Sequence, residues 1–341
     1  MFAARHRPIG PDPWRLLRPL PIRRGGFPAA GATGFPMAIH SGPADAARQG
    51  LHRGPVVLLG AGNLIARYLM PRLLAAGYDT VAVARRAAPV PSEIRVETVE
   101  FGGDESWAAP PGAAVVSVLP LAVLAGALPR LAGARCIVAI GSTSLFSKAE
   151  SDDTEERATA RKLERAEAVI MARCAEDGTP ATILRPTLVY DGIGDRNVAR
   201  MIRVVRRYRV LPIARPSHGL RQPIHADDVA KAILGAIDNP DAAGRAFNIA
   251  GGEVLTYRVM AERVFRSQGL RPRFLALPVG WLRGAFRLAE RVGVVRETGF
   301  GSAVFERMNR DLVFDNEEGL RVLGYAPRGF EPLELVGWVG S

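Results

Sequence analysis

The clearest pattern of apolar and polar positions follows Pro55. Val56–Leu59 is an unbroken apolar run that ends at a glycine, which is typical of a strand buried on both faces of a parallel sheet. Apolar residues then recur at helical spacing until Gly77, which is placed to end that helix. Thr80–Ala84 is a second apolar strand. This order of strand, glycine-rich turn, helix and strand predicts a βαβ unit.

The alternation of strands and helices continues along the chain. Further strands are predicted at 94–101, 113–119, 135–140, 181–184 and 246–249, and helices at 121–131, 153–176, 197–208, 228–237 and 257–268. Asp153 is the expected cap of its helix, with Glu156 as the capping-box partner. The pattern predicts an α/β fold, with a Rossmann-type doubly wound parallel sheet at 54–190. Residues 191–341 form a smaller C-terminal α/β region, from which about 221–250 returns to the core.

The glycine-rich turn suits a dinucleotide. Gly60 and Gly62 allow the backbone to bend and to approach a pyrophosphate, and the first N–H groups of the helix attract an anion. In the pattern G-x-G-x-x-G, the third glycine position is occupied by Ile65. The pattern G-x-x-G-x-x-G is the alternative. In it Asn63 takes the second glycine position, because Asn tolerates the left-handed conformation, and Ala66 takes the third as a small residue. The alternative is a tight turn in a parallel-sheet unit without a ligand.

A basic pair, Arg85 and Arg86, ends the second strand, and no acidic residue stands beside it. An acidic residue at this place hydrogen-bonds the ribose 2′-OH of NAD, whereas an Arg accommodates the 2′-phosphate of NADP. The pair therefore favours NADP, with NAD as the second option. A solvated basic turn is the reading without a ligand.

Six short segments follow one another along residues 55–270. They are GAGNLIA at 60–66, GD at 103–104, VAIGSTSLF at 138–146, LRPTLVY at 184–190, PIHADDV at 223–229 and FNIAGG at 247–252. In type and order they resemble the extended short-chain dehydrogenase/reductase family, the NAD(P)-dependent nucleotide-sugar epimerases and dehydratases. The resemblance implies an oxidoreductase acting on a nucleotide sugar or a related hydroxy or keto compound.

The resemblance also implies roles for individual residues. Ser142 would be the catalytic hydroxyl and Lys162 would hold the nicotinamide ribose, while the segment after the sixth strand and Arg221 would face the substrate. The implied cofactor residues are Gly60, Gly62, Asn63, Leu64, Ile65, Arg85, Arg86, Asp104, Leu119, Pro120 and Pro186. The implied substrate residues are Arg196, Asn197 and Arg221. No metal site is expected.

The chain departs from the family at the active site. The family uses Tyr-x-x-x-Lys, but Ala158 stands four residues before Lys162, and no Tyr occurs between Asp79 and Ala181. Other candidates for the base are Tyr190, His225 and either Glu155 or Glu156. The departure keeps a second hypothesis open, a non-catalytic NAD(P)-binding sensor or assembly factor of the same fold.

Composition and charge limit the remaining options. The net charge is +11, of which residues 1–53 contribute +6, and this stretch is expected to be a disordered extension or an overlong start, with Met37 as another start. No basic stripe alternates with aromatic residues, so nucleic acid is not an expected partner. The basic amphipathic stretch Val279–Val292 is expected to cap the small domain rather than to contact a membrane. Two cysteines without metal or disulfide spacing fit a reducing compartment, so a cytoplasmic protein is expected, and a homodimer is compatible with the sequence.

Overall fold

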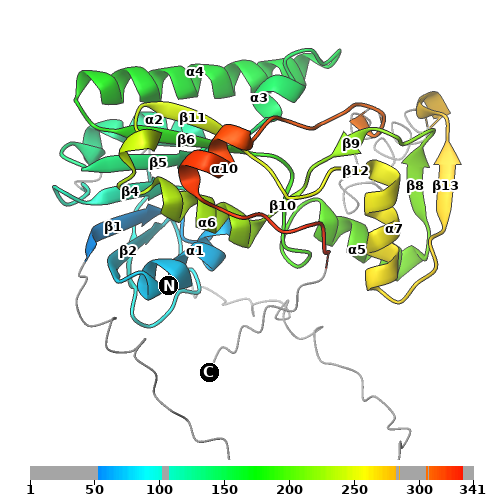
Figure 1. The fold of residues 1–341 in the computed structure, drawn as a ribbon, viewed down its shortest axis with the longest axis horizontal. Helices are drawn as coiled ribbons and strands as arrows, with labels where there is room; N and C mark the ends of the chain where they lie inside the picture. Colours follow the sequence, from blue (N-terminus) through cyan, green and yellow to red (C-terminus); the bar gives the residue numbers. More distant parts are fainter. Residues whose placement is uncertain (1–52, 102–106, 282–283, 285–304, 306, 333–341) are drawn as a thin grey trace, which may run out of the picture. The chain divides into compact units, whose positions relative to one another are not determined.

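The computed structural model describes residues 53–101, 107–281, 284, 305 and 307–332. Its centre is a seven-stranded sheet in the order β11-β6-β5-β4-β1-β2-β3, in which every neighbouring pair is parallel (Figure 1). The strands are β1 (Arg53–Leu59), β2 (Tyr78–Ala84), β3 (Arg95–Thr98), β4 (Ala114–Ser117), β5 (Cys136–Ile140), β6 (Ala181–Pro186) and β11 (Arg245–Ile249). The chain runs outward from β1 to β3 and then restarts on the other side at β4. The strand order therefore reverses between β1 and β4, which confirms the doubly wound α/β fold.

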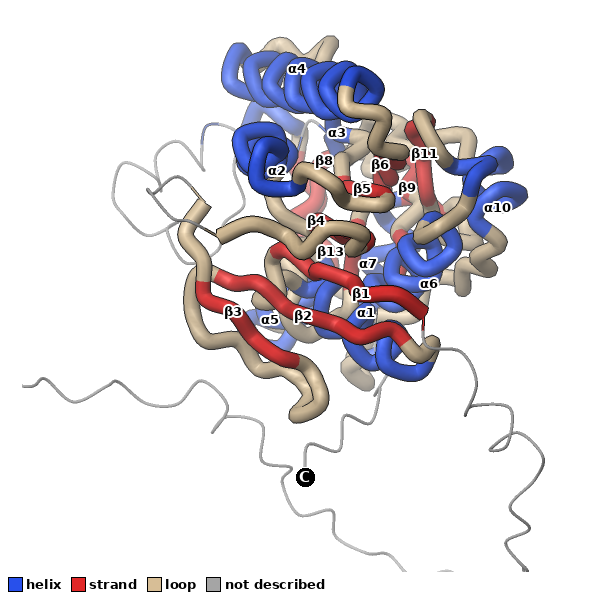
Figure 2. Tube along the Cα trace, turned by 90° about the vertical axis from the view of Figure 1, so that its left-hand side faces the viewer, coloured by secondary structure: helices blue, strands red, loops and turns tan. Residues whose placement is uncertain are grey.

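Helices cover both faces of the sheet. In Figure 2 the strands stack in their sheet order, with α2 and α4 on one side and α1 and α6 on the other. The helices are α1 (Leu64–Ala75), α2 (Leu121–Ala127), α3 (Ser144–Ser147), α4 (Thr154–Glu176), α5 (Val198–Tyr208), α6 (Ala226–Ala236), α7 (Tyr257–Ser267) and α10 (Glu317–Leu323).

The apolar run of β1 places buried side chains on both faces of the sheet. Val56 and Leu58 belong to the cluster under α1 and α6, whereas Val57 and Leu59 belong to the cluster under α2 and α4. Successive side chains of a strand point to opposite faces, so a strand covered on both sides must be apolar at every position. All four residues are fully buried.

A third apolar cluster lies in the C-terminal region, between α5, α7 and a short parallel sheet of β8 (Leu211–Ala214) and β13 (Phe274–Leu277). Two more strand pairs link this region to the rest. They are β7 (Val189–Tyr190) with β10 (Ile224–His225), and β9 (Leu220–Arg221) with β12 (Leu255–Thr256). The predicted segment Val279–Val292 lies mostly outside the described residues, as do residues 1–52.

Several local features differ from the sequence-based expectation. The helix expected at 121–131 continues beyond Ala127 as a 3₁₀ helix, where Pro129 has no N–H to donate. The Asp153 carboxylate caps α4 as predicted, accepting from Glu155 N at 2.8 Å, but the Glu156 carboxylate binds Ser151 and Arg307 instead of closing a capping box. The helix expected from Asp228 begins at Ala226, because the His225 imidazole caps it.

Candidate functional site

The turn after β1 is shaped by Gly60. Its φ is 98°, and a Cβ there would lie 3.0 Å from Val118 Cγ2 and 3.1 Å from Leu119 Cδ2. The Gly60 and Ala61 N–H groups both donate to Val83 O, at 2.8 and 3.1 Å, which ties the turn to the end of β2. Any larger residue at position 60 would be strained in its backbone and would press on the residues that follow β4.

Asn63 joins the turn to β4. Its Oδ1 accepts from Ile65 N at 2.9 Å as the N-cap of α1, and its Nδ2 donates to Val118 O at 3.0 Å. The expectation of a left-handed Asn was wrong, because Asn63 is extended, with φ −77° and ψ 152°. An amide fits here because it accepts and donates at once, which neither Gly nor Asp can do.

Replacing Asn63 with Ala should lower the free energy of unfolding by about 1–2 kcal/mol, since the cap and the bond to Val118 O are both lost. Chemical denaturation by urea measures the change. Asn63→Ser keeps a capping oxygen but cannot reach across to β4, so its cost should be smaller. Equal costs for the two variants would show that the bridge to Val118 contributes the whole effect.

A cavity of about 1210 Å³ opens where the strand order reverses. Ligands of open parallel sheets bind outside the carboxyl ends of the strands at this point. Eight predicted cofactor residues line the cavity, together with Ser142 and all three predicted substrate residues. These are Gly60, Gly62, Asn63, Leu64, Arg85, Arg86, Leu119, Pro120, Ser142, Arg196, Asn197 and Arg221.

Three predicted site residues of the described part of the chain do not line the cavity. Ile65 is buried in the apolar cluster under α1, and Pro186 acts through its carbonyl, which accepts from Thr143 N and Oγ1, both at 3.1 Å. Lys162 is exposed on α4 and does not line the cavity. Asp104 lies outside the described residues. The role of Lys162 stays a prediction, and the structure places Lys148 at the cavity instead.

The cofactor half of the cavity fits a dinucleotide. A Cβ on Gly62 would meet nothing within 4 Å, so the backbone of this lining residue is open to a close approach. The helix α1 begins beside it and directs its amino end, with its partial positive charge, toward this end of the cavity. Arg85, Arg86 and the residues up to Pro89 line the cavity at the end of β2 without an acidic residue among them.

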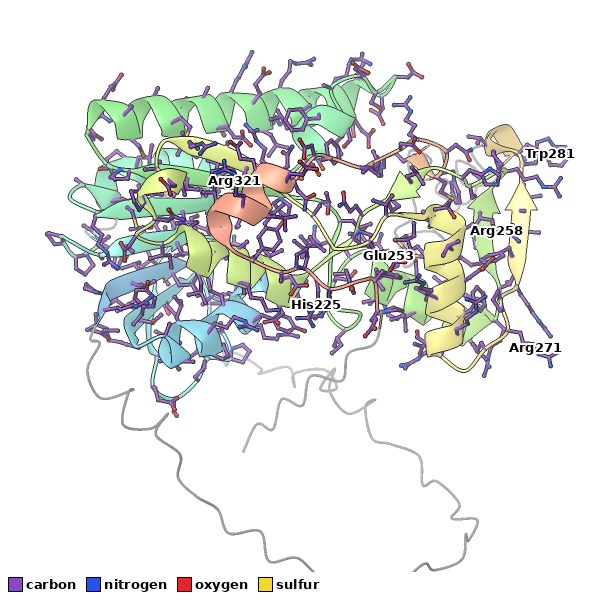
Figure 3. All side chains as sticks on the ribbon, in the orientation of Figure 1. His225, Glu253, Arg258, Arg271, Trp281 and Arg321 are labelled. Carbon is purple, nitrogen blue, oxygen red and sulfur yellow. The ribbon has the colours of Figure 1, made fainter. Side chains whose placement is uncertain are left out.

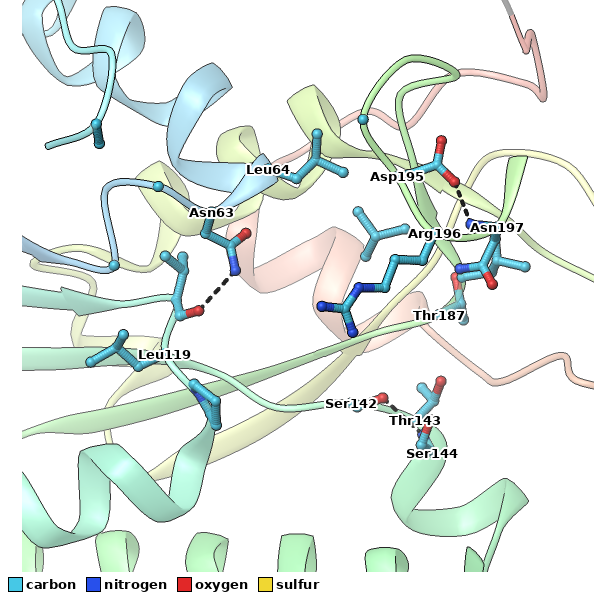
Figure 4. A pocket seen from close by; sticks show the side chains of 18 of the residues that line it. Asn63, Leu64, Leu119, Ser142, Thr143, Ser144, Thr187, Asp195, Arg196 and Asn197 are labelled. Atoms are coloured by element: carbon cyan, nitrogen blue, oxygen red, sulfur yellow. Dashed lines mark hydrogen bonds between the residues drawn. The ribbon is translucent and has the colours of Figure 1, made fainter. Parts of the chain in front are cut away.

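The other half is built by the turn after β5. Ser142 Oγ accepts from Ser144 N at 3.1 Å, so the hydroxyl proton is free to be donated to a ligand. Thr143 is fixed to Pro186 O on the neighbouring strand β6. Figure 4 shows Ser142 across the cavity from Asn63, with the Arg196 side chain extending into the space between them. The hydroxyl and the guanidinium can therefore reach one ligand.

Four cationic side chains line this half: Lys148, Arg196, Arg221 and Arg307. Burial lowers the pKa of Lys148, and the neighbouring charge of Arg307 lowers it further. Burial likewise lowers the pKa of Arg221 to about 10. Two nitrogens of Arg221 donate to the carbonyls of Leu220, Arg307 and Arg310, so this side chain holds the wall of the cavity while adding charge to it.

Sequence reasoning missed Lys148 and Arg307. Lys148 follows Ser142 by six residues, and its place in the loop after a parallel strand could have suggested it. Arg307 comes from a distant segment and pairs with Glu156 at the start of α4. No local pattern could have brought it to the cavity.

None of the alternative bases lines the cavity. Tyr190 is fully buried, and its hydroxyl bonds Gly329 O at 3.3 Å and Glu331 N at 3.1 Å, while burial raises its pKa to about 12. His225 caps α6, and burial lowers its pKa to about 4. Glu156 is paired with Arg307, and Glu155 is exposed in the first turn of α4.

Comparison with known proteins gives a family model that matches part of the chain, and a shared fold. The model of the NAD dependent epimerase/dehydratase family matches residues 102–250. The structure of MoeE5 in complex with UDP-glucose and NAD superposes with a TM-score of 0.61 at 20% identity, covering 82% of this chain and 95% of that one. At this identity the likeness shows a shared fold.

Two curated relatives match shorter stretches. An uncharacterized protein, y4nG of Sinorhizobium fredii, is 28% identical over 153 residues, which is 45% of this chain and 37% of the relative. The NADH dehydrogenase [ubiquinone] 1 alpha subcomplex subunit 9 of Arabidopsis thaliana is 31% identical over 99 residues, which is 29% of this chain and 24% of the relative. The matches thus span little more than a third of these relatives at most.

Two features are absent from the described residues. No described helix is long and apolar enough to cross a membrane. No group of three or more His, Cys, Asp or Glu among the described residues is arranged to hold a metal ion.

Proposed function

We propose that this chain is a member of the NAD-dependent epimerase/dehydratase family, whose model matches residues 102–250, and that it is an NAD(P)-dependent oxidoreductase acting on a nucleotide sugar or a related hydroxy or keto substrate. The observation that carries the proposal is the continuous cavity from the Gly60–Asn63 turn to Ser142 and Arg196. Its two ends have different chemistry: an open glycine turn with a helix amino end, and a hydroxyl among four cations.

The cationic half suits the substrate of such an enzyme. MoeE5, which shares the fold, was solved with UDP-glucose, whose diphosphate carries negative charge. Arg196 extends freely into the cavity, and a guanidinium pairs with phosphate through two parallel hydrogen bonds (Figure 4). We assign the diphosphate of the substrate to Arg196, and its sugar to the space beside Ser142.

The reaction requires the movement of a hydride and a proton. When bound, the nicotinamide supplies the hydride acceptor or donor for the reacting carbon. Ser142 donates its hydroxyl proton in a hydrogen bond to the substrate oxygen, which stabilises negative charge that develops there. Oxidation of a hydroxyl also releases the O–H proton. Among the described residues, Lys148 is the one lysine that lines the cavity, and we assign the acceptance of this proton to it.

A cofactor titration followed by a substrate panel tests the proposal. A ligand at 100 times its Kd should stabilise the native state by about 2.7 kcal/mol, which thermal unfolding detects. Turnover of a UDP-sugar that is lost in Ser142→Ala and Lys148→Met, but kept in Lys162→Met, would support an enzyme with these roles. Cofactor binding without turnover of any nucleotide sugar would favour the non-catalytic hypothesis. The absence of binding by NADPH and NADH would overturn both.

The preference for NADP has its own test. Removing Arg85 and Arg86 together by substitution with Ala should weaken NADPH binding about tenfold and leave NADH binding unchanged, because only NADPH carries the 2′-phosphate. Calorimetric titration with each cofactor measures both affinities. Arg95→Ala on the next strand, where the side chain is exposed and pairs with Glu97, is the matched control. A similar loss for both cofactors would contradict the assignment.

A further inference from the structure

The positive charge of the folded part of the chain is concentrated in one place. Residues 198–215 and 255–281 together hold eleven Arg and a single acidic residue, Glu262, which gives a net charge of +10. The chain as a whole has a net charge of +11, with +6 in residues 1–53, so the remaining residues sum to −5. The charge of these two stretches is therefore a local feature and does not reflect a generally basic protein.

The fold brings the two stretches together. They form α5 with β8 and α7 with β13, which pack around the third apolar cluster. Leu211 N donates to Arg273 O at 3.0 Å, and Arg206 Nε donates to Gln268 Oε1 at 2.5 Å, so the carboxyl ends of both helices meet the starts of both strands. We call this place the basic end. It consists of Arg206, Arg207, Arg209, Arg266, Arg271 and Arg273, all exposed.

Local structure explains only part of this cluster. Arg side chains stabilise the carboxyl end of a helix, and Arg206, Arg207 and Arg266 lie in the last turns of α5 and α7. Arg266 also pairs with Glu262, at 3.6 Å. Among the described residues, however, no carboxylate pairs with Arg207, Arg209, Arg271 or Arg273. Arg207 lies over the Tyr208 ring, at 5.8 Å from its centroid, but these four like charges are retained without a carboxylate partner in the described part of the chain.

Exposed apolar and aromatic side chains accompany the arginines. Tyr208, between Arg207 and Arg209, is 58% exposed, and Leu275, two residues after Arg273, is 51% exposed. Figure 3 shows Arg271 and Arg258 at the outer end of the fold, beside α7 and β13. Clustered cations with an exposed tyrosine and an exposed aliphatic side chain are typical of proteins that rest on an acidic bilayer, where the arginines reach headgroup phosphates and the other side chains enter the interface.

We propose that the basic end, with Tyr208 and Leu275, binds the surface of a membrane that contains acidic phospholipids. Two observations favour a bilayer over a nucleic acid, whose phosphates would also attract arginine. The apolar Leu275 has no role on a phosphate backbone, and the basic end offers one aromatic ring rather than the series on which bases stack. The proposal is independent of the cavity and of the reaction assigned to it.

Co-sedimentation of the full chain with vesicles tests the proposal. Vesicles of phosphatidylcholine with about 30% phosphatidylserine should bind the protein, and vesicles of phosphatidylcholine alone should bind it at least tenfold less. Raising the salt from about 0.05 M to about 0.5 M should release most of the protein, since screening weakens each contact. Equal binding to both kinds of vesicle would overturn the proposal.

Charge-reversal variants distinguish binding by the basic end from attraction by the net charge of the whole protein. Arg207→Glu with Arg271→Glu should reduce binding to the acidic vesicles more than tenfold, because each Arg near the surface contributes about fivefold. The matched control, Arg161→Glu with Arg165→Glu on the exposed face of α4, makes the same change in net charge and keeps the N-terminal arginines.

Equal losses in the two double variants would show non-specific attraction and would overturn the proposal. Unchanged thermal unfolding of both variants would show that they fold. Leu275→Ser should weaken binding further at high salt, where charge is screened. Tighter binding of a single-stranded RNA oligonucleotide than of the acidic vesicles, at equal salt, would identify the basic end as a nucleic-acid surface instead and would also overturn the proposal.

Discussion

Gly62→Asp should remove most of the stabilisation of the protein by NADPH and leave the free energy of unfolding of the ligand-free protein almost unchanged. A side chain at position 62 would enter open space, since a Cβ meets nothing within 4 Å. The added carboxylate would stand where the pyrophosphate is expected and would repel it. If the affinity falls about 100-fold, a concentration that gave about 2.7 kcal/mol of stabilisation would give about 0.4 kcal/mol.

The control for this variant is Gly126→Asp. Gly126 is an exposed residue of α2 whose Cβ would also meet nothing within 4 Å, and it does not line the cavity. This variant should respond to NADPH like the unmodified protein. If Gly62→Asp kept the full NADPH shift, the cofactor would not approach the turn, and the assignment of the glycines would be wrong.

Asp228→Ala should lower the free energy of unfolding by about 3 kcal/mol, a typical cost of removing one partner of a buried ion pair. The Asp228 side chain is fully buried and accepts from Lys231 Nζ at 2.7 Å, and from Arg328 through its backbone N and its Nε, both at 3.0 Å. Arg328 also reaches Asp227, which pairs with Arg72 of α1. Loss of Asp228 therefore loosens the C-terminal segment from α6. Urea denaturation measures the cost, and Asp241→Ala, at an exposed position, should cost far less.

The ion pairs of Asp228 also predict that the stability of the protein depends on pH. Burial alone would raise the pKa of Asp228, but hydrogen bonds from Arg328 and Lys231 outweigh burial and hold the pKa below its usual range. A lowered pKa in the folded state adds stability that is present above the unfolded value of about 3.9 and is lost as the pH falls through the folded value. The difference in stability from Asp228→Asn should therefore shrink below about pH 4. A constant difference down to pH 2 would contradict this explanation.

The parts of the site that depend on local pattern were predictable. The apolar run of β1, the glycine after it and the helix that follows specified the turn, because backbone geometry and strand burial act over a few residues. The exposed pair Arg85 and Arg86 lines the cavity because it follows a strand of the same sheet. The identity of the fold followed from the alternation alone.

Contacts between distant segments could not be predicted. Arg307 reaches the cavity because its segment passes the start of α4, where Glu156 holds it. Arg221 resembled a free phosphate ligand, yet the carbonyls of Arg307 and Arg310 occupy its nitrogens. The basic end also could not be predicted, since its two stretches are about forty residues apart and are brought together by the pairing of β8 with β13 and the packing of α5 and α7.

Several hydrogen bonds within the protein hold the turn after β1. Gly60 N and Ala61 N share Val83 O, Asn63 N donates to Gly60 O at 2.9 Å, and the Asn63 amide reaches Val118 O. The turn is therefore preorganised, so a ligand that binds there spends little free energy on ordering the backbone. The bonded amide protons of Gly60, Ala61 and Asn63 should therefore exchange with solvent slowly, and a bound cofactor should slow them only slightly.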